Sequence, residues 1–339
     1  MSIPVVDFGA CSLREKDVSE EQMISLSKDL ETAFTEVGFV FLKNTGITQE
    51  EVDRVMAISK TFFLQPDEEK QPFSRKSFAG SPNHGWVSFG IERLNPSRPG
   101  DLKEAFNITS LQPDIKWPSE AAKGFREIQT SFFQRCKELS LRVLKVMAFS
   151  LGLDPEVFLS AHRFIGEEGN CSTLRTLYYP PVKHEEVKEG QLRCGEHSDY
   201  GSITLLFKSS VGLQVRQRSG EFLCAPAVPG AVLVNIADLM QRWTGDHFVS
   251  VLHRVLLPPP WRPQHPTVSG FLRAAGRRGA DLLLRRIQQI PSSDGRRIHR
   301  RALQSLIRTK LNPCTSLKSY THQEVFYQFY QHTVFTFWI

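Results

Sequence analysis

Two short polar motifs in the second half of the sequence contain the side-chain types that bind divalent metal ions. One is His197-Ser-Asp199, within GEHSDYG (195–201), and the other is His253, 56 residues further on in LHRV (252–255). On a β-strand alternate residues share a face, so a His-x-Asp pair can direct an imidazole and a carboxylate toward one ion. Zinc is less favoured, because its sites usually contain cysteine or close into a tetrahedron. Two histidines and one carboxylate leave three coordination positions open, which is typical of non-haem Fe(II) sites.

A His-x-Asp pair alone is a weak indication of a metal site, because roughly 0.5 such pairs are expected by chance in a chain of this length. The alternative is a surface histidine beside a solvated aspartate. His184-Glu-Glu186 has a similar pattern, but it follows Pro180-Pro181 in a charged stretch and is typical of a solvated loop. The second histidine, His253, is what favours a metal site at His197 and Asp199.

The elements that must position these residues change type near residue 172. Before it, amphipathic patterns predict helices over 20–37, 49–64, 120–153 and 154–162, the first two opened by the capping boxes Ser19–Gln22 and Thr48–Glu51. IPVVDF (3–8) and FVFLKN (39–44) predict strands, and residues 74–100, rich in Ser, Gly, Pro and Asn, predict an exposed loop. From 172 to 258, short apolar runs alternate with turns, which is typical of an antiparallel sandwich or barrel.

Composition and cysteine usage exclude several classes of protein. The 339 residues are 40% hydrophobic and 23% charged, which is ordinary for a globular protein. No apolar run approaches the roughly 20 residues of a membrane span, and MSIPVVDFG does not resemble a secretory signal. The six cysteines are scattered without a CxxC pair, which indicates a reducing compartment. We therefore expect a cytoplasmic protein with no membrane partner.

The net charge of +6 is concentrated in one segment. Residues 261–310 carry 12 Lys or Arg against 2 Asp or Glu, and the first 260 residues have a net charge of −4. A nucleic-acid-binding protein would spread basic residues over a binding face and interleave them with aromatic residues for stacking. No aromatic residue occurs between 272 and 310. We therefore expect no nucleic-acid partner.

The ordered motifs of residues 3–258 resemble the iron- and 2-oxoglutarate-dependent dioxygenases of the isopenicillin N synthase-like family. The blocks that carry the resemblance are IPVVDF, EVGFVFLKNTGI (36–47), FFLQPDEEK (62–70), LRTLYYPP (174–181), GEHSDYGSITLLF (195–207), GLQV (212–215), PGAVLVNIADLMQRWTGD (229–246) and LHRV. The resemblance implies an α+β fold, with a double-stranded β-helix (jelly-roll) core and a helical N-terminal region. It divides the chain into an N-terminal region (1–110), supporting helices (111–171), a truncated core (172–258) and an atypical Arg-rich tail (259–339).

The resemblance also assigns the site. It implies that His197, Asp199 and His253 bind Fe(II) and that Tyr179 helps to hold a carboxylate of 2-oxoglutarate, with no further catalytic residue. Leu177 stands where the family usually has an asparagine.

Other polar residues near the motifs receive structural interpretations. Asn235 and Trp243 lie in the family's packing strands, and Ser202 and Thr204 either line the pocket or are half-buried strand hydroxyls. The charged residues of the loop before DLKEAF (101–106) either face the substrate or are solvated, and we favour solvated charges: Glu92, Arg93 and Arg98.

The resemblance ends near residue 258. About ten residues after its second histidine the family has Arg-x-Ser, whose arginine pairs with the distal carboxylate of 2-oxoglutarate. Arg262 is near that spacing, but Gln264 stands where serine belongs, so the motif is absent. We consider two interpretations of the tail, translation in a shifted reading frame and a basic extension. Either interpretation predicts a core without its last strands.

The activity implied is oxidation of a small organic molecule by O₂, with conversion of 2-oxoglutarate to succinate and CO₂. Fe(II) is the implied metal, and ascorbate is the expected reductant. Two alternatives remain open: a metal-binding relative impaired by loss of the anchoring arginine, and an oxidase of the same fold that needs no 2-oxoglutarate. We expect a small-molecule substrate and a monomeric protein.

Overall fold

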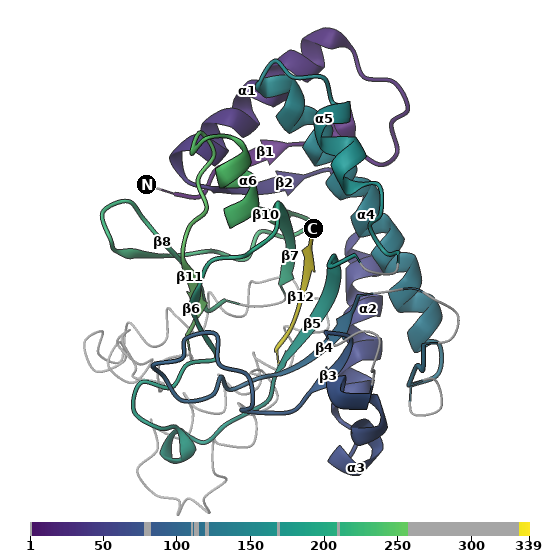
Figure 1. Cartoon of the computed structure of the whole chain (residues 1–339), viewed down its shortest axis with the longest axis vertical. Coiled ribbons are helices and arrows are strands. Elements are labelled where there is room, and N and C mark those ends of the chain that lie inside the picture. The colour runs from purple at the N-terminus through teal and green to yellow at the C-terminus, as the bar shows by residue number, and fades with distance from the viewer. Residues whose placement is uncertain are drawn as a thin grey trace, which may run out of the picture. The chain divides into compact units, whose positions relative to one another are not determined.

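The computed structural model describes residues 2–77, 83–109, 111, 115–118, 122–167, 170–208, 211–256 and 332–339 (Figure 1). All of them belong to one of the two compact units into which the chain divides, Met1–Leu257 with Tyr327–Ile339. The other unit, Pro258–Phe326, lies outside the described residues, and so do Arg262 and Gln264; of the tail (259–339), the structure describes residues 332–339.

Two helices of the first half, α1 and α2, begin at the capping boxes that the sequence predicts. The α-helices are α1 (Glu20–Glu36), α2 (Gln49–Phe63), α3 (Asp67–Lys70), α4 (Phe125–Ser150), α5 (Glu156–Leu159) and α6 (Asp238–Trp243). Short 3-10 turns are η1 (Gly9–Cys11), η2 (Gln71–Phe73), η3 (Arg75–Ser77), η4 (Ser160–His162) and η5 (His184–Glu186). Both bonds of the capping box are present at Ser19 and at Thr48, which confirms the two predicted helix starts. Gly38, with a φ of +73°, follows α1 and turns the chain into a strand.

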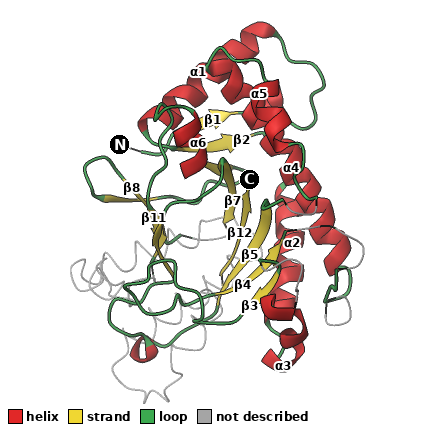
Figure 2. Ribbon diagram, in the orientation of Figure 1, coloured by secondary structure: helices red, strands yellow, loops and turns green. Residues whose placement is uncertain are grey.

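The strands form two sheets (Figure 2). They are β1 (Val5–Asp7), β2 (Phe39–Lys43), β3 (Gly85–Val87), β4 (Glu104–Ile108), β5 (Thr173–Tyr179), β6 (Cys194–His197), β7 (Ile203–Lys208), β8 (Leu213–Arg216), β9 (Phe222–Cys224), β10 (Val232–Ile236), β11 (His253–Val255) and β12 (His332–Trp338). The larger sheet has the order β1-β2-β10-β7-β12-β5-β4-β3, and the smaller has the order β6-β11-β8-β9. All pairs of neighbouring strands are antiparallel except β1 with β2.

The larger sheet buries both of its faces, because alternate side chains of each strand enter different apolar clusters. Leu205 and Phe207 of β7 pack with Phe34 of α1 and Phe133 of α4 in the main core. Leu206, between them, packs with residues of β8 in a second cluster. The helices therefore cover one face of the larger sheet, and the smaller sheet covers part of the other.

Two features of the sheets differ from the expectations. Residues 74–100, predicted as an exposed loop, include β3, whose Trp86 is buried and donates a hydrogen bond from Nε1 to Glu104 Oε2 (2.8 Å). The polar, glycine-rich composition of residues 74–100 gives no indication of this contact, because Trp86 and Glu104 are 18 positions apart. The larger sheet also gains β12, which pairs with β5 on one side and β7 on the other, so the prediction that the core lacks its last strands is wrong at this position.

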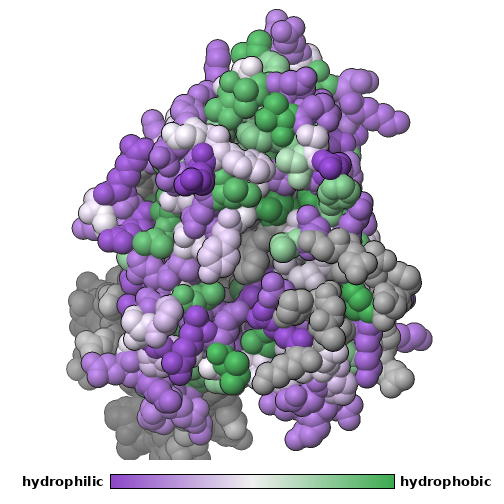
Figure 3. All heavy atoms as spheres, viewed as in Figure 1, coloured by the Kyte–Doolittle hydropathy of each residue, from purple (hydrophilic) through white to green (hydrophobic). Residues whose placement is uncertain are grey.

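Hydrophilic side chains cover most of the described surface on the face viewed in Figure 3. No helix among the described residues is both long enough and apolar enough to cross a membrane.

Candidate metal centre

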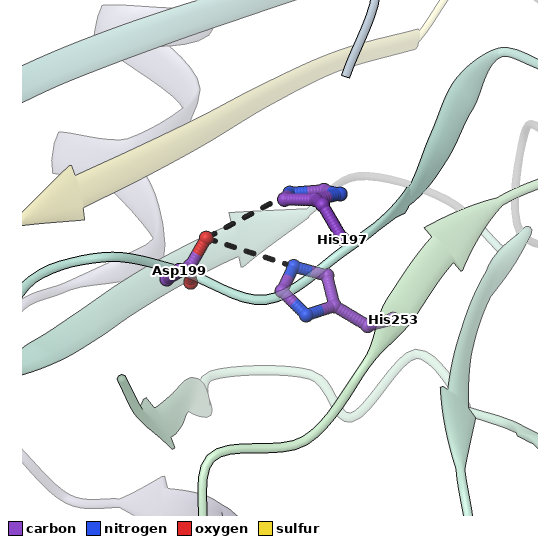
Figure 4. Close-up of side chains that lie close together, drawn as sticks. All are labelled: His197, Asp199 and His253. Atoms are coloured by element: carbon purple, nitrogen blue, oxygen red, sulfur yellow. Dashed lines mark ion pairs between the residues drawn. The ribbon is translucent and has the colours of Figure 1, made fainter. Parts of the chain in front are cut away.

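The smaller sheet and the loop after β6 bring His197, Asp199 and His253 together, and their ligand atoms all lie within 4.8 Å of one another. His197 ends β6 and His253 begins β11, and the two residues are direct partners in the antiparallel pairing of these strands. Asp199 Oδ1 lies 3.7 Å from His197 Nε2 and 3.8 Å from His253 Nε2 (Figure 4). Among the described residues, this is the one group of three or more His, Cys, Asp or Glu side chains with the geometry to hold a metal ion.

The position of Asp199 differs in one respect from the sequence-based expectation. The His-x-Asp pair was predicted to lie on one strand, but β6 ends at His197 and Asp199 lies in the loop that follows. The loop is held where it leaves the sheet, because the backbone N–H of Asp238 donates to the carbonyl of Asp199 (2.8 Å). A loop hydrogen-bonded to α6 thus sets the aspartate position, instead of strand alternation.

Backbone carbonyls orient both imidazoles. His197 Nδ1 lies 2.8 Å from Gly195 O, and His253 Nδ1 lies 3.3 Å from Val251 O. When Nδ1 donates its N–H to the carbonyl, the Nε2 atom of each histidine keeps a lone pair, which lies on the side of Asp199. Metal-binding histidines in proteins are usually held in this way, with the nitrogen that does not bind the metal donating a hydrogen bond. Burial, and then the neighbouring charge of His253, lowers the pKa of His197 to about 4. His197 is therefore neutral at pH 7, which metal binding requires.

The second carboxylate oxygen of Asp199 is held by two donors. Thr204 Oγ1 donates to Asp199 Oδ2 (2.7 Å), and Asn235 Nδ2 donates to the same atom (2.8 Å). Burial alone raises the pKa of Asp199, but the two histidines and these two hydrogen bonds outweigh it, so the pKa is lowered and the carboxylate stays ionised. Asn235, predicted to be a packing residue, thus contacts a candidate ligand, as does Thr204.

Replacing Thr204 by valine is expected to weaken Fe(II) binding about 10- to 100-fold, the usual cost of removing a group that orients a metal ligand. Valine keeps the shape of the side chain but cannot donate to Asp199 Oδ2, so the carboxylate is less firmly oriented. Anaerobic calorimetric titration of the metal-free protein with Fe(II) measures the change. The control is Thr45→Val, because Thr45 is also buried but its hydroxyl accepts from Ile47 N. Equal weakening by both substitutions would contradict a specific role for Thr204.

A cavity of about 760 Å³ opens beside His197 and Asp199. Its lining combines charged and aromatic side chains from several elements: Arg75, Glu92, Arg93, Arg175, Tyr200 and Trp243. Ser202 also lines it, with its hydroxyl 2.8 Å from His162 Nε2. The cavity is of the size that holds a small molecule.

The loop charges near the cavity are only partly as predicted. Glu92 is not a solvated charge, because it forms ion pairs with Arg175 and with Lys103 (3.2 Å between Nζ and Oε2). Burial by itself raises the pKa of Glu92, but these two cations lower it to about 2, so the side chain is ionised. Arg93 lines the cavity, whereas Arg98 donates to Gly190 O (3.0 Å) on the neighbouring loop.

Tyr179 lies at the end of β5, on the face of the larger sheet that meets the smaller sheet. It is 2% exposed and packs with Leu177, Cys194 and Val255. Its hydroxyl has no hydrogen-bond partner among the described residues. A buried hydroxyl without a partner is uncommon in folded proteins.

A β-sandwich in which two histidines from paired strands and one aspartate converge beside a small-molecule cavity defines the class of non-haem iron oxygenases. Two family models match the chain. The N-terminal model of the non-haem dioxygenase in morphine synthesis covers residues 3–128, and the 2OG-Fe(II) oxygenase superfamily covers residues 170–262.

Individual relatives agree with this class. The 2-oxoglutarate-dependent dioxygenase htyE of Aspergillus rugulosus is 30% identical over 277 residues, which are 76% of this chain and 81% of that protein. The proline hydroxylase buaE of Petromyces alliaceus is 34% identical over 68% of this chain and 74% of its own length. The crystal structure of a full-length Neurospora crassa protein in complex with alpha-KG (2-oxoglutarate) superimposes with a TM-score of 0.66 and 34% identity, over 76% of this chain and 80% of that one.

The chain belongs to the 2OG-Fe(II) oxygenase superfamily. It is an oxidoreductase that uses Fe(II) and 2-oxoglutarate and acts on a small molecule, and its core has the jelly-roll fold of that superfamily.

Proposed function

We propose that His197, Asp199 and His253 are the Fe(II) ligands of this dioxygenase and that Tyr179 contacts 2-oxoglutarate. The observation that carries the assignment is the convergence of two Nε2 atoms on Asp199 Oδ1, at 3.7 and 3.8 Å. The donor set fits Fe(II), because two neutral imidazoles and one carboxylate on one side leave the other side open for further ligands. When bound, Fe(II) and 2-oxoglutarate supply O₂ activation and the two electrons that accompany conversion to succinate and CO₂.

The residues of the chain itself position and protect this chemistry. Gly195 O and Val251 O hold the imidazole rings, and Thr204 and Asn235 hold the carboxylate, so the three ligands are oriented before an ion arrives. The apolar cluster around Tyr179 limits water on the side toward β5. The cavity lined by His197 and Asp199 provides the position for the substrate.

The lining of the cavity supports a substrate with polar groups. Arg175 and Glu92 contribute a cation and an anion, and Tyr200, 85% exposed, contributes an aromatic ring. The relatives differ in what they bind or modify: the Neurospora crassa protein was also solved with thymine, and buaE is named a proline hydroxylase. We therefore propose a small polar organic molecule and leave its identity to substrate screening.

From the sequence we also propose a monomeric protein with a helical first region. We propose that the chain divides into residues 1–110, 111–171, 172–258 and 259–339. The same holds for ascorbate as reductant, the cytoplasmic location and the absence of a nucleic-acid partner.

The test is release of succinate from 2-oxoglutarate in the presence of Fe(II), ascorbate and a panel of small polar substrates. We expect turnover by the wild type, and Tyr179→Phe is expected to raise the KM for 2-oxoglutarate by about tenfold or more, since a hydrogen bond to a charged group contributes about 1.5–3 kcal/mol. Tyr178→Phe is the control, because Tyr178 packs on the opposite face of β5 and stacks on Phe63. Iron binding without any succinate would instead support the impaired relative.

A further inference from the structure

Four cationic side chains are buried among the described residues, each at most 4% exposed: Lys70, Lys103, Arg175 and Arg193. Three of them have carboxylate partners within 4 Å. Lys70 pairs with Asp67 and Glu104, Lys103 with Asp101 and Glu92, and Arg175 with Glu92. Arg193 is the exception, since no carboxylate among the described residues lies within 4 Å of it.

The hydrogen bonds of Arg193 satisfy only part of its guanidinium. Nη1 donates to Pro180 O (2.6 Å) and to Leu102 O (3.3 Å), while Nε and Nη2 have no acceptor among the described residues. A guanidinium presents five N–H donors in a planar fork that matches a carboxylate. Neither Nε nor Nη2 is among the fully buried side-chain atoms without a partner, so both atoms are accessible to water or to an anionic ligand.

Arg193 lies beside the end of β5 that carries Tyr179. Its Nη1 bonds the carbonyl of Pro180, which is the residue directly after Tyr179. Burial lowers the pKa of Arg193, and Tyr179 and Tyr178 are the groups that oppose this shift. The hydroxyl of Tyr179 lacks a partner among the described residues. An uncompensated cation and an unpartnered hydroxyl therefore occupy the same end of one strand.

The strand that pairs with this end of β5 supplies no cation within the described residues. β12 begins at His332, which is the partner of Tyr179 in the pairing with β5. Residues 332–339, HTVFTFWI, contain no arginine or lysine. Within the described part of the chain, Arg193 is thus the buried cation at this end of β5 that is available to an incoming anion.

We propose that Arg193, acting with Tyr179, is the site that binds the distal carboxylate of 2-oxoglutarate in this protein. The proposal rests on the function proposed above and deepens it, because it replaces the family's Arg-x-Ser contact by a residue that directly precedes β6. The contact is a charge-assisted hydrogen-bonded pair in an apolar surrounding, where such pairs are strongest.

The test compares two 2-oxo acids in wild-type protein and in Arg193→Met, each loaded with Fe(II) under anaerobic conditions. 2-Oxoglutarate has a distal carboxylate, and 2-oxopentanoate has the same chain length without it. We expect Arg193→Met to weaken binding of 2-oxoglutarate by on the order of 30-fold or more while changing binding of 2-oxopentanoate less than about twofold, by calorimetric titration. Arg193→Lys, which keeps the charge but not the fork, is expected to give an intermediate loss.

Arg135→Met is the control, because Arg135 lies on α4 and also donates to a backbone carbonyl, Gly46 O (2.7 Å), although it pairs with Glu51 as well (2.9 Å). Equal weakening of both 2-oxo acids, or no change for either, overturns the proposal. If Arg193→Met does not fold, the lysine variant decides the matter by the same comparison.

Selective loss of 2-oxoglutarate binding with no succinate release by the wild type supports this site and overturns the proposed function. Turnover by the wild type with unchanged binding in both Arg193 variants supports the proposed function and overturns the Arg193 site. A metal-loaded wild type that binds no 2-oxoglutarate overturns both.

Discussion

Replacing His253 by alanine is expected to lower the affinity of the protein for Fe(II) by more than about 100-fold and to abolish succinate release. His253 Nε2 lies 3.8 Å from Asp199 Oδ1, and it is one of only three candidate ligand atoms in the group. Removing a group that only orients a ligand costs about 10- to 100-fold, so loss of a ligand itself should exceed that range. Anaerobic titration with Fe(II) and a succinate assay measure the two effects separately.

The control for this substitution is His247→Ala. His247 lies six residues earlier, is 44% exposed and pairs with Glu31 Oε1 (3.0 Å), outside the group of candidate ligands. It should bind iron and release succinate as the wild type does. Iron affinity unchanged in His253→Ala would remove His253 from the ligand set and would leave the proposed mechanism without its facial arrangement.

Replacing Phe337 by alanine is expected to reduce the free energy of unfolding by about 3–5 kcal/mol, the usual range for a buried phenylalanine. Phe337 is fully buried, and its ring meets that of Phe133 on α4 edge-to-face, with 4.9 Å between centroids. It lies in β12, which pairs with β5 and β7 along most of its length. The loss therefore measures how firmly the last residues of the chain are held in the larger sheet.

Chemical denaturation followed by circular dichroism gives the change in free energy. Phe164→Ala is the control, because Phe164 is 47% exposed, and it should cost less than about 1 kcal/mol. A comparably small effect at Phe337 would mean that β12 does not lie between β5 and β7. The core would then have the open edge that the sequence predicts.

Local signals in the sequence were sufficient for the first two strands and the longer helices of the first half. The capping boxes at Ser19 and Thr48 act between residues three positions apart, so they can be read without tertiary information. The short apolar runs after residue 172 predicted strands for the same reason, since strand periodicity is local. The residues of the candidate metal centre were also recognisable, because His197 and Asp199 lie two positions apart and the motifs around them are distinctive.

What the sequence could not provide are contacts between residues far apart in the chain. The amide of Asn235 reaches Asp199 across 36 positions, and Arg193 reaches Leu102 across 91. No pattern in a single sequence registers such pairs, so Asn235 was interpreted as a packing residue and Arg193 was not singled out.

The sequence by itself thus determined which side chains are available for metal chemistry and which local elements carry them. Only the tertiary structure decided how those side chains are oriented, that Glu92 is paired and half-buried, that β12 joins the larger sheet, and that one buried arginine lacks an anion. The physical reason is that helix starts and strand periodicity depend on neighbouring residues. Charge compensation, sheet pairing and ligand orientation depend instead on which distant segments the folded core brings into contact.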